Sequence, residues 1–325
     1  MGNGMQSNED PAAGAGRGWG KDLLGLRGVG REAILQVLHQ AQAMLPLATE
    51  KRRRWEPLRG RVVVNLFYEP STRTRISFEL AARALGADVV NVTTAQSSVV
   101  KGESLVDTAR TLQALGADLV VLRHPASGAP HRVAQAVRVG VVNAGDGTNE
   151  HPTQGLLDLF TIWQLKGRLE GVRVVLVGDI LHSRVARSNL WGLSAVGAQV
   201  GFCGPATLLP RPQDVPGVRF FSRLEDALEW ADVVNMLRLQ RERQVHGYLP
   251  ALGEYRQRFG LTAQRLRRLR PDVLVMHPGP ANVGVEIDEE VLADPRSAIS
   301  RQVSFGVAVR MAVLSLWCGQ GELSR

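Results

Sequence analysis

The sequence predicts an α/β fold with two doubly wound domains, each built on a mainly parallel sheet that helices flank on both faces. The first observation is the length of 325 residues, which suits roughly two domains of ordinary size. The second is a regular alternation of short β-branched runs with helical patterns. The third is that these runs are apolar without interruption, which is typical of strands buried on both faces.

Two series of strands are expected, separated by a helix over residues 153–165. The strands lie at residues 62–67, 89–92, 119–122 and 139–143, and then at 173–177, 199–203, 232–236 and 273–276. Apolar residues spaced by three and four predict an earlier helix over residues 31–47. A final amphipathic helix over residues 304–317 needs an apolar surface, so we expect it to pack back on the first domain. Such helices would join the two domains.

The predicted domain boundaries follow from these elements. Residues 1–18 are rich in Gly, Asn and Ala and are expected to form a flexible tail. A first domain is expected over residues 19–152 plus 304–325, and a second over residues 153–303. Two domains invite a cleft between them.

The composition is that of a folded soluble protein, with 44% hydrophobic and 22% charged residues. No apolar run approaches the roughly 18 to 20 residues of a membrane helix, and the first 20 residues contain no signal-peptide core, so a cytoplasmic location is expected. Cys203 and Cys318 stand far apart and suggest neither a disulfide framework nor a zinc site. We expect both to be buried.

The formal net charge of +8 suits an anionic partner, which could be nucleic acid, a membrane surface or a small phosphorylated or carboxylated substrate. The densest basic run, residues 51–54 beside Trp55, is interpreted as a solvated helix end. Phe, Trp and Tyr total only 5%, which disfavours stacking on nucleic acid.

One polar run follows a predicted strand and opens a predicted helix. It contains Ser71, Thr72, Arg73 and Thr74. Because a helix N-terminus presents unpaired N–H groups and partial positive charge, these hydroxyls and the guanidinium would form a phosphate cradle. The alternative is that Ser71 or Thr72 only caps the helix. The run matches neither the dinucleotide glycine fingerprint nor the P-loop.

At this point the sequence resembles the aspartate/ornithine carbamoyltransferase family. The run "FYEPSTRTRISFE" (residues 67–79) is similar to the carbamoyl phosphate signature of that family. The resemblance continues through "VVKGES" (99–104), "LRHP" (122–125), "GDGTNEHPTQGLLDLFTI" (145–162) and "HPGP" (277–280), and covers roughly residues 20–318. It implies a homotrimer and no metal or organic cofactor.

The resemblance also implies roles at the carbamoyl phosphate end of a site. Ser71, Thr72, Arg73 and Thr74 would hold the phosphate, and Arg123 would bridge the phosphate and the carbonyl oxygen. His151 would donate to that oxygen and Gln154 would orient the carbamoyl amide. Taken alone, His151 is better explained as a local hydrogen-bonded histidine, but the surrounding "TNEHPTQ" reverses that. Ser97 and Lys101 lie on a loop whose family counterpart enters the site of a neighbouring subunit; without the resemblance, Lys101 reads as a surface lysine.

The second substrate depends on the second domain, where "MLRLQRER" (residues 236–243) resembles the aspartate branch of the family. Arg238 and Gln240 would bind the side-chain carboxylate and Arg184 the α-carboxylate, with Lys101 nearby. Either arginine alone could be a surface ion pair. The ornithine branch would carry "HCLP" and "SMG" runs, which this chain lacks. Gly279 and Pro280 would contribute backbone to closure, and Gly279 departs from the Leu of many relatives.

These residues predict transfer of the carbamoyl group of carbamoyl phosphate to the amino group of L-aspartate, a step of pyrimidine synthesis. The alternative within the family is another amine, such as ornithine. A nucleic-acid-binding protein and a catalytically silent assembly subunit are disfavoured, the latter because every motif residue is present. Dihydroorotase-like or regulatory partner chains are possible, whereas nucleic acid and membrane are not expected as partners.

Overall fold

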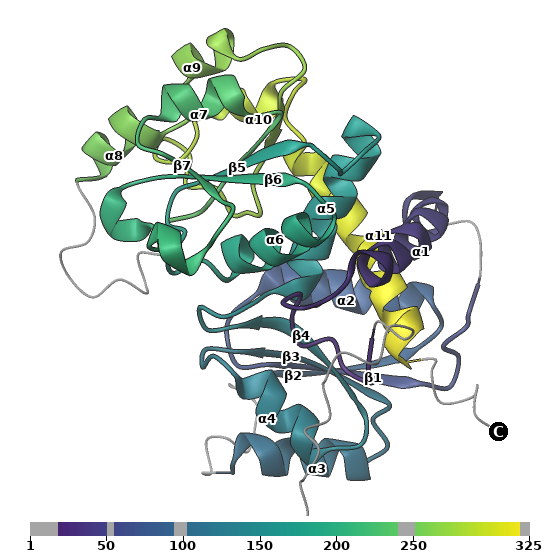
Figure 1. Ribbon diagram of the computed structural model, residues 1–325. Helices are drawn as coiled ribbons and strands as arrows, with labels where there is room; N and C mark the ends of the chain where they lie inside the picture. The colour runs from purple at the N-terminus through teal and green to yellow at the C-terminus, as the bar shows by residue number, and fades with distance from the viewer. Residues whose placement is uncertain (1–18, 51–54, 94–102, 240–250, 319–325) are drawn as a thin grey trace, which may run out of the picture.

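The computed structural model describes residues 19–50, 55–93, 103–239 and 251–318 (Figure 1). The tail predicted over residues 1–18 and the basic run at 51–54 lie outside these residues. Three predicted site residues, Ser97, Lys101 and Gln240, also lie outside them. What the sequence predicts for these segments stays a prediction.

The first half of the chain forms a parallel sheet of order β2-β1-β3-β4 between two layers of helices (Figure 1). Residues of β3 alternate between the layers: Leu119 and Val121 join the core that includes α1 and α2, whereas Val120 and Leu122 join the core that includes α3 and α4. The elements are α1 (Arg31–Glu50), β1 (Val62–Phe67), α2 (Thr72–Ala84), β2 (Asp88–Thr93), α3 (Leu105–Ala114), β3 (Leu119–His124), α4 (Ala129–Ala136) and β4 (Gly140–Asp146).

The second half forms a parallel sheet of order β7-β6-β5-β8-β9, again covered on both faces. Val174 and Leu176 of β5 pack toward the core shared with α5 and α6, whereas Val175 and Val177 pack toward α7 and α8. The elements are α5 (Pro152–Lys166), β5 (Arg173–Val177), α6 (Arg184–Ala195), β6 (Gln199–Cys203), the 3-10 turns η3 (Ala206–Leu208) and η4 (Pro212–Asp214), β7 (Arg219–Phe221), α7 (Leu224–Trp230), β8 (Val233–Met236), α8 (Leu252–Phe259), α9 (Ala263–Arg268), β9 (Leu274–Met276), α10 (Glu289–Ala293) and α11 (Ile299–Cys318).

This architecture confirms the predicted fold class, two parallel-sheet α/β domains flanked by helices. All eight predicted strands are present among the described elements, β1, β5 and β6 with the predicted bounds. The edge strand β7 was not predicted. Both cysteines are free and buried, as expected.

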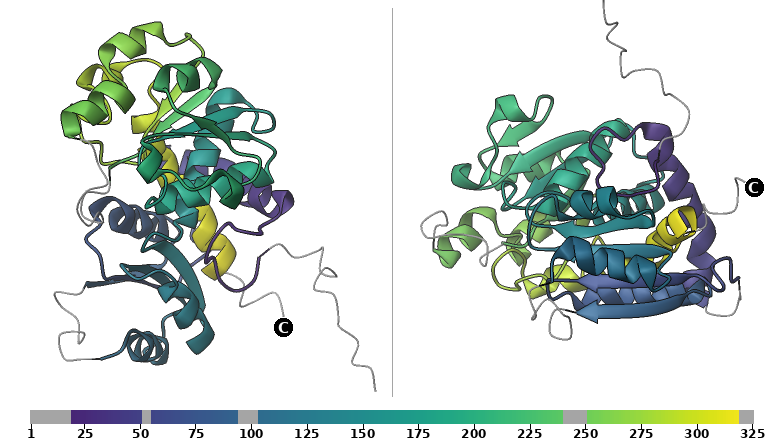
Figure 2. Two further views of the ribbon diagram at one scale, coloured as in Figure 1. Left: turned by 60° about the vertical axis from the view of Figure 1, so that its left-hand side comes forward. Right: turned by 90° about the horizontal axis from the view of Figure 1, so that it is seen from below.

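Two long helices connect the halves of the molecule. α5 leads from the first sheet into the second, and α11 packs against α1, α2 and α5, as expected for a terminal helix that needs an apolar surface (Figures 1 and 2). α11 begins at Ile299 rather than at residue 304, and most of its central turns are buried on all sides rather than on one face.

The sequence analysis found no segment suited to a membrane, but α11 meets that criterion by length and mean hydropathy. Half of its apolar window is buried within the protein, and its neighbours are the helices α1, α2 and α5. Those contacts identify α11 as a core helix.

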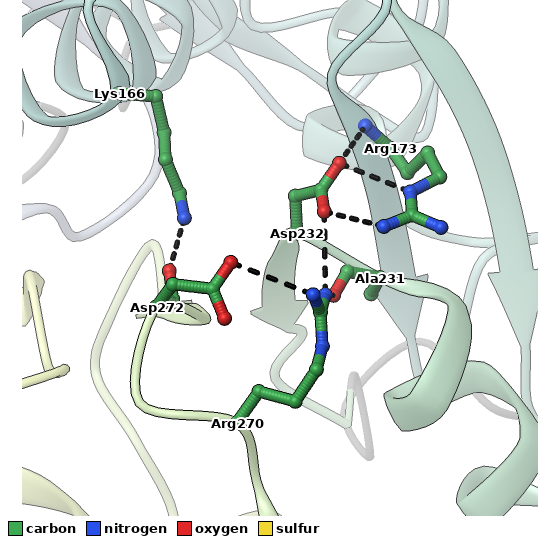
Figure 3. A network of polar contacts seen from close by, with 6 residues as sticks. All are labelled: Lys166, Arg173, Ala231, Asp232, Arg270 and Asp272. Atoms are coloured by element: carbon green, nitrogen blue, oxygen red, sulfur yellow. Dashed lines mark hydrogen bonds and ion pairs between the residues drawn. The ribbon is translucent and has the colours of Figure 1, made fainter.

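An ion-pair network joins the amino-terminal ends of strands β5 and β8 in the second sheet (Figure 3). The carboxylate of Asp232 accepts from Arg173 through backbone N at 3.0 Å, Nε at 3.1 Å and Nη2 at 2.7 Å, and from Arg270 Nη2 at 3.3 Å. Arg270 also reaches Asp272, whose backbone oxygen accepts from Lys166 Nζ at the end of α5. These bonds hold the pKa of Asp232 well below its ordinary value, the hydrogen bonds from Arg173 being the main cause.

We predict that Asp232→Asn lowers the free energy of unfolding at pH 7 by about 1 to 2 kcal/mol, because charge-assisted hydrogen bonds are lost from partly exposed partners. A carboxylate whose pKa is depressed in the folded state contributes its full stability above the unfolded pKa, and this contribution is lost as pH falls from the unfolded pKa through the folded one. The difference between variant and wild type should therefore shrink as pH falls below about 4. Urea denaturation at several pH values measures this, with the exposed Asp214→Asn as control. An equal loss in both variants, or a gap that widens in acid, would contradict the assignment.

Candidate active site

The carboxyl ends of strands from both sheets surround one cavity of about 730 Å³. Parallel α/β sheets bind ligands at this end of their strands. Every predicted site residue that the structure describes lines the cavity: Ser71, Thr72, Arg73, Thr74, Arg123, His151, Gln154, Arg184, Arg238, Gly279 and Pro280. The structure thus brings together residues that are up to about 200 positions apart in the sequence.

The cavity is strongly cationic. Its described lining contains five arginines and a single carboxylate, that of Glu69; the arginines are Arg73, Arg123, Arg184, Arg238 and Arg310. Like charges held this close repel one another unless an anion lies between them. The arrangement is suited to a ligand, or a pair of ligands, with several negative charges.

The amino terminus of α2 opens into the cavity. Ser71 is the N-cap residue and has an extended backbone, but its side chain makes no capping hydrogen bond. The alternative that Ser71 serves only as a cap is therefore not realised in this structure. Arg73 extends from the first turn, and partial burial together with the charge of Arg238 lowers its pKa. An anion at this helix end would meet free N–H groups, hydroxyls and a guanidinium.

Glu69 joins the two sides of the cavity, a role that the sequence analysis missed. Its Oε2 lies 3.2 Å from Arg123 Nε on β3 and accepts a 2.8 Å hydrogen bond from Arg184 Nη2 on α6. Arg123 also donates to the backbone oxygen of Ala144 at 3.3 Å. Glu69 stood inside the quoted motif, and its signal was an acidic residue placed directly at a strand end among basic ones.

His151 and Gln154 lie at the start of α5. The backbone N–H of His151 donates to Ser188 Oγ at 2.9 Å, and its Nδ1 lies 3.4 Å from Thr153 Oγ1. Burial, together with the charges of neighbouring arginines, holds the pKa of His151 well below its ordinary value, so the ring is neutral. Gln154 donates through Nε2 to Asp158 at 2.9 Å. A neutral imidazole and an amide held in one orientation can form specific hydrogen bonds to a small polar group of a ligand.

The second sheet supplies the loops after β8 and β9. Arg238 follows β8, and the next backbone N–H, of Leu239, donates to Glu286 Oε1 at 2.8 Å. After β9, His277 N donates to Gln302 Oε1 at 3.0 Å, and His277 Nδ1 accepts from Gly279 N at 2.8 Å. Burial, followed by nearby arginines, lowers the pKa of His277 to about 3. Both loops are thus held by buried polar groups of the same domain and of α11.

Two buried charged residues in helices were not predicted from the sequence. Arg310 lies on α11 with its guanidinium 5.3 Å from the centre of the Phe78 ring, and burial lowers its pKa to about 10. Asp158 lies on α5, and burial raises its pKa to about 6. The available signal was a single charge inside an otherwise apolar helical run, which is costly without a partner or a function.

The comparisons with known proteins agree with this geometry. Residues 21–164 match the carbamoyl-P binding domain of aspartate/ornithine carbamoyltransferase, and residues 170–317 match the Asp/Orn binding domain. The chain is 57% identical over 299 residues to the aspartate carbamoyltransferase catalytic subunit of Heliobacterium modesticaldum, covering 92% of this chain and 96% of that one.

Two solved structures show that the fold alone does not distinguish the aspartate enzymes from the ornithine enzymes of this family. Aspartate transcarbamoylase of Trypanosoma cruzi in complex with carbamoyl phosphate and aspartate superposes with a TM-score of 0.83 at 32% identity, covering 92% of this chain and 96% of that one. Ornithine carbamoyltransferase of Pyrococcus furiosus superposes with a TM-score of 0.82 at 28% identity, covering 92% and 97%. On the matching domains and these relatives, the chain belongs to the aspartate/ornithine carbamoyltransferase family.

Proposed function

We propose that this protein transfers the carbamoyl group of carbamoyl phosphate to the amino group of L-aspartate, giving N-carbamoyl-L-aspartate and phosphate for pyrimidine synthesis. The observation that carries the proposal is the cavity lined by five arginines and one carboxylate at the carboxyl ends of both sheets. The names of the relatives support the same reaction.

The charge of the cavity favours aspartate over ornithine as the acceptor. Aspartate has two carboxylates, each of which a guanidinium can bind through two parallel hydrogen bonds. Ornithine would bring a second ammonium group. The carboxylate in the described lining, Glu69, already contacts Arg123 and Arg184. This chain resembles structures of both branches of the family almost equally well. The choice of aspartate over ornithine therefore depends on the charge of the cavity.

The phosphate end of the site is assigned to α2. Ser71, Thr72, Arg73 and Thr74 bind the phosphate with the helix N-terminus, as the uncapped Ser71 side chain supports. Arg123 bridges the phosphate and the carbonyl oxygen. Arg184 binds the α-carboxylate of aspartate, and Arg238 binds the side-chain carboxylate. Gln240, Ser97 and Lys101 complete the proposed set but lie outside the described residues.

The reaction begins with attack of the aspartate amine on the carbonyl carbon. The resulting tetrahedral oxyanion is stabilised by Arg123, Thr74 and His151, contacts that can each contribute about 3 kcal/mol. In this proposal the neutral His151 ring donates through Nε2–H, and the Thr153 hydroxyl, 3.4 Å from Nδ1, can then donate to Nδ1. The C–O bond to phosphate then breaks, and the departing phosphate accepts the amine proton. The remaining rate enhancement comes from positioning of the two substrates and from exclusion of water between the domains.

A homotrimer with shared active sites belongs to the same proposal. At the edge of the cavity, Ile76 and Leu80 of α2 and Val303 of α11 are 43%, 52% and 56% exposed. An apolar group of this kind beside a polar site suits coverage by another chain. In the proposed trimer a neighbouring chain covers it. We also propose a cytoplasmic location and association with dihydroorotase-like or regulatory partner chains.

The function is tested by a phosphate-release assay with carbamoyl phosphate and a panel of amines. Aspartate alone among aspartate, ornithine, glutamate and lysine should release phosphate above the rate without amine. Release with ornithine instead would place the chain in the other branch.

Two arginine variants separate the two substrates. We predict that Arg73→Ala lowers turnover about 1000-fold or more, since charge on the leaving phosphate loses its main partner.

Arg238→Ala should raise the KM for aspartate about 100-fold, since a carboxylate loses its guanidinium, while the Kd of carbamoyl phosphate changes little. Calorimetry and steady-state kinetics measure both. Near-normal turnover in the first variant, or equal weakening of both substrates in the second, would refute the assignments.

Gly279 offers a test of how Arg73 is placed. Gly279 has a φ of +65°, and a Cβ there would lie 2.1 Å from Arg73 Nη1. Because residue 279 is Gly, where many relatives carry Leu, it leaves space that the guanidinium of Arg73 occupies. Gly284 has a φ of +80° but open space around its Cβ position. We predict that Gly279→Ala weakens carbamoyl phosphate binding about tenfold by displacing Arg73, whereas Gly284→Ala carries only the backbone strain. Equal effects in both variants would mean that strain alone is responsible.

The shared site is tested by mixing inactive trimers. If each site combines Arg73 of one chain with Lys101 of the next, Arg73→Ala and Lys101→Ala should each be nearly inactive alone. Random reassortment of equal amounts should recover about a quarter of wild-type turnover, because about three-quarters of trimers are mixed and each has one intact site in three. Native mass confirms chain exchange. Exchanged trimers with no recovered activity would show that Lys101 does not act across the interface.

A further inference from the structure

Asp158, which the proposed mechanism does not use, is the centre of a buried polar cluster. Its Oδ1 accepts from Gln154 Nε2 and Gln302 Nε2, each at 2.9 Å. Its Oδ2 accepts from Asn189 Nδ2 at 2.7 Å and from Asn235 Nδ2 at 3.4 Å. These amides come from α5, α11, α6 and β8. Within the described part of the chain, no lysine, arginine or histidine forms an ion pair with Asp158.

A carboxylate in this position fixes the direction of each amide around it. An ionised carboxylate only accepts hydrogen bonds, so every neighbouring amide must turn its N–H group inward and its oxygen outward. Gln302 shows this orientation independently, because its outward Oε1 accepts from His277 N at 3.0 Å. Burial raises the pKa of Asp158 to about 6 and the four amides oppose that shift, so the carboxylate is ionised at neutral pH.

Gln154 is the amide of this group that lines the cavity. With Nε2 bound to Asp158, its Oε1 is directed away from the carboxylate, and among the described residues no group donates to it. Such an oxygen is an acceptor available to a ligand N–H. A carbamoyl group has an NH₂ that can donate to it, whereas an acetyl group has a methyl in the same place.

We propose that Asp158 is a positioning residue that fixes Gln154 with its oxygen toward the cavity, and thereby makes the site prefer a carbamoyl phosphate over an acyl phosphate of the same shape. Through Gln302 the same carboxylate holds the segment that begins at His277, on the other side of the cavity. This inference rests on the proposed function, because it assigns how that site recognises its donor substrate.

The competing interpretation is that Asp158 only holds four elements together. The two interpretations differ in what a substitution does to acetyl phosphate. Loss of packing would weaken both acyl phosphates together, because both use the same phosphate contacts. Loss of Gln154 orientation would weaken carbamoyl phosphate alone.

The test compares the Kd of carbamoyl phosphate with the Kd of acetyl phosphate, measured by calorimetry on the full-length protein without aspartate. Asp158→Ala removes both acceptor oxygens, so no carboxylate holds the Nε2 of Gln154 away from the cavity. We expect the preference for carbamoyl phosphate to fall about tenfold, with the Kd of acetyl phosphate changed less than about twofold. If Asp158→Ala does not fold, Asp158→Ser is measured in the same way, with the same expected loss.

Two further variants give the experiment its controls. Asn189→Leu removes a donor from Oδ2 and should lower stability while leaving the preference unchanged. Gln154→Leu should lose the preference itself, and adding Asp158→Ala to it should then produce no further loss, because Asp158 acts through Gln154.

The inference is overturned if the preference survives in Asp158→Ala, if Asn189→Leu reduces it equally, or if the two substitutions at 154 and 158 act additively. Wild-type protein that binds carbamoyl phosphate but never carbamoylates aspartate would refute the proposed function instead. The two failures are therefore distinguishable.

Discussion

Five guanidinium groups directed at one cavity set the main constraint on this protein. Their mutual repulsion opposes folding, and only Glu69 offsets it with a carboxylate in the described lining. The arginines come from different parts of the fold, namely α2, β3, α6, the loop after β8 and α11, so no one element has to hold adjacent charges. Arg310 is further accommodated over the Phe78 ring. Substrates with several negative charges complete the balance, so the site is arranged for a ligand at some cost in stability.

The topology explains why such a site can be held firmly. In both sheets the strands are parallel, so their carboxyl ends reach the same edge and turn toward the same space. α5 and α11 cross between the domains and carry His151, Gln154, Gln302 and Arg310. Residues on shared helices keep their spacing to both sheets, whereas residues on the loops after β8 and β9 depend on local hydrogen bonds such as those of Glu286.

The sequence predicted the parts whose signal is local. Strands buried on both faces have unbroken β-branched runs, so β1, β5 and β6 were predicted to the residue. β7 was missed because it is only three residues long and its first residue, Arg219, is exposed at the sheet edge. The start of α11 was placed late because Ser300, Arg301 and Gln302 read as polar loop, although Gln302 is buried against Asp158. The site residues came from motifs, but the pairs that they form did not, since Gln302 and Asp158 are 144 positions apart and Arg184 and Glu69 are 115 apart.

The Asp158 cluster also bears on how two substrates in two domains are handled together. Asn235, in β8, donates to Asp158 on α5, and the strand that contains Asn235 leads within three residues to Arg238. The carboxylate that orients Gln154 for the donor substrate therefore also contacts the strand that presents the arginine proposed for the acceptor. The bonds from Gln302 and Asn235 end on the same buried side chain, so a displacement of α11 or of β8 relative to α5 would strain the contacts of Asp158. The carbamoyl recognition proposed for Gln154 and the strand that leads to the arginine proposed for aspartate thus share contacts with one side chain.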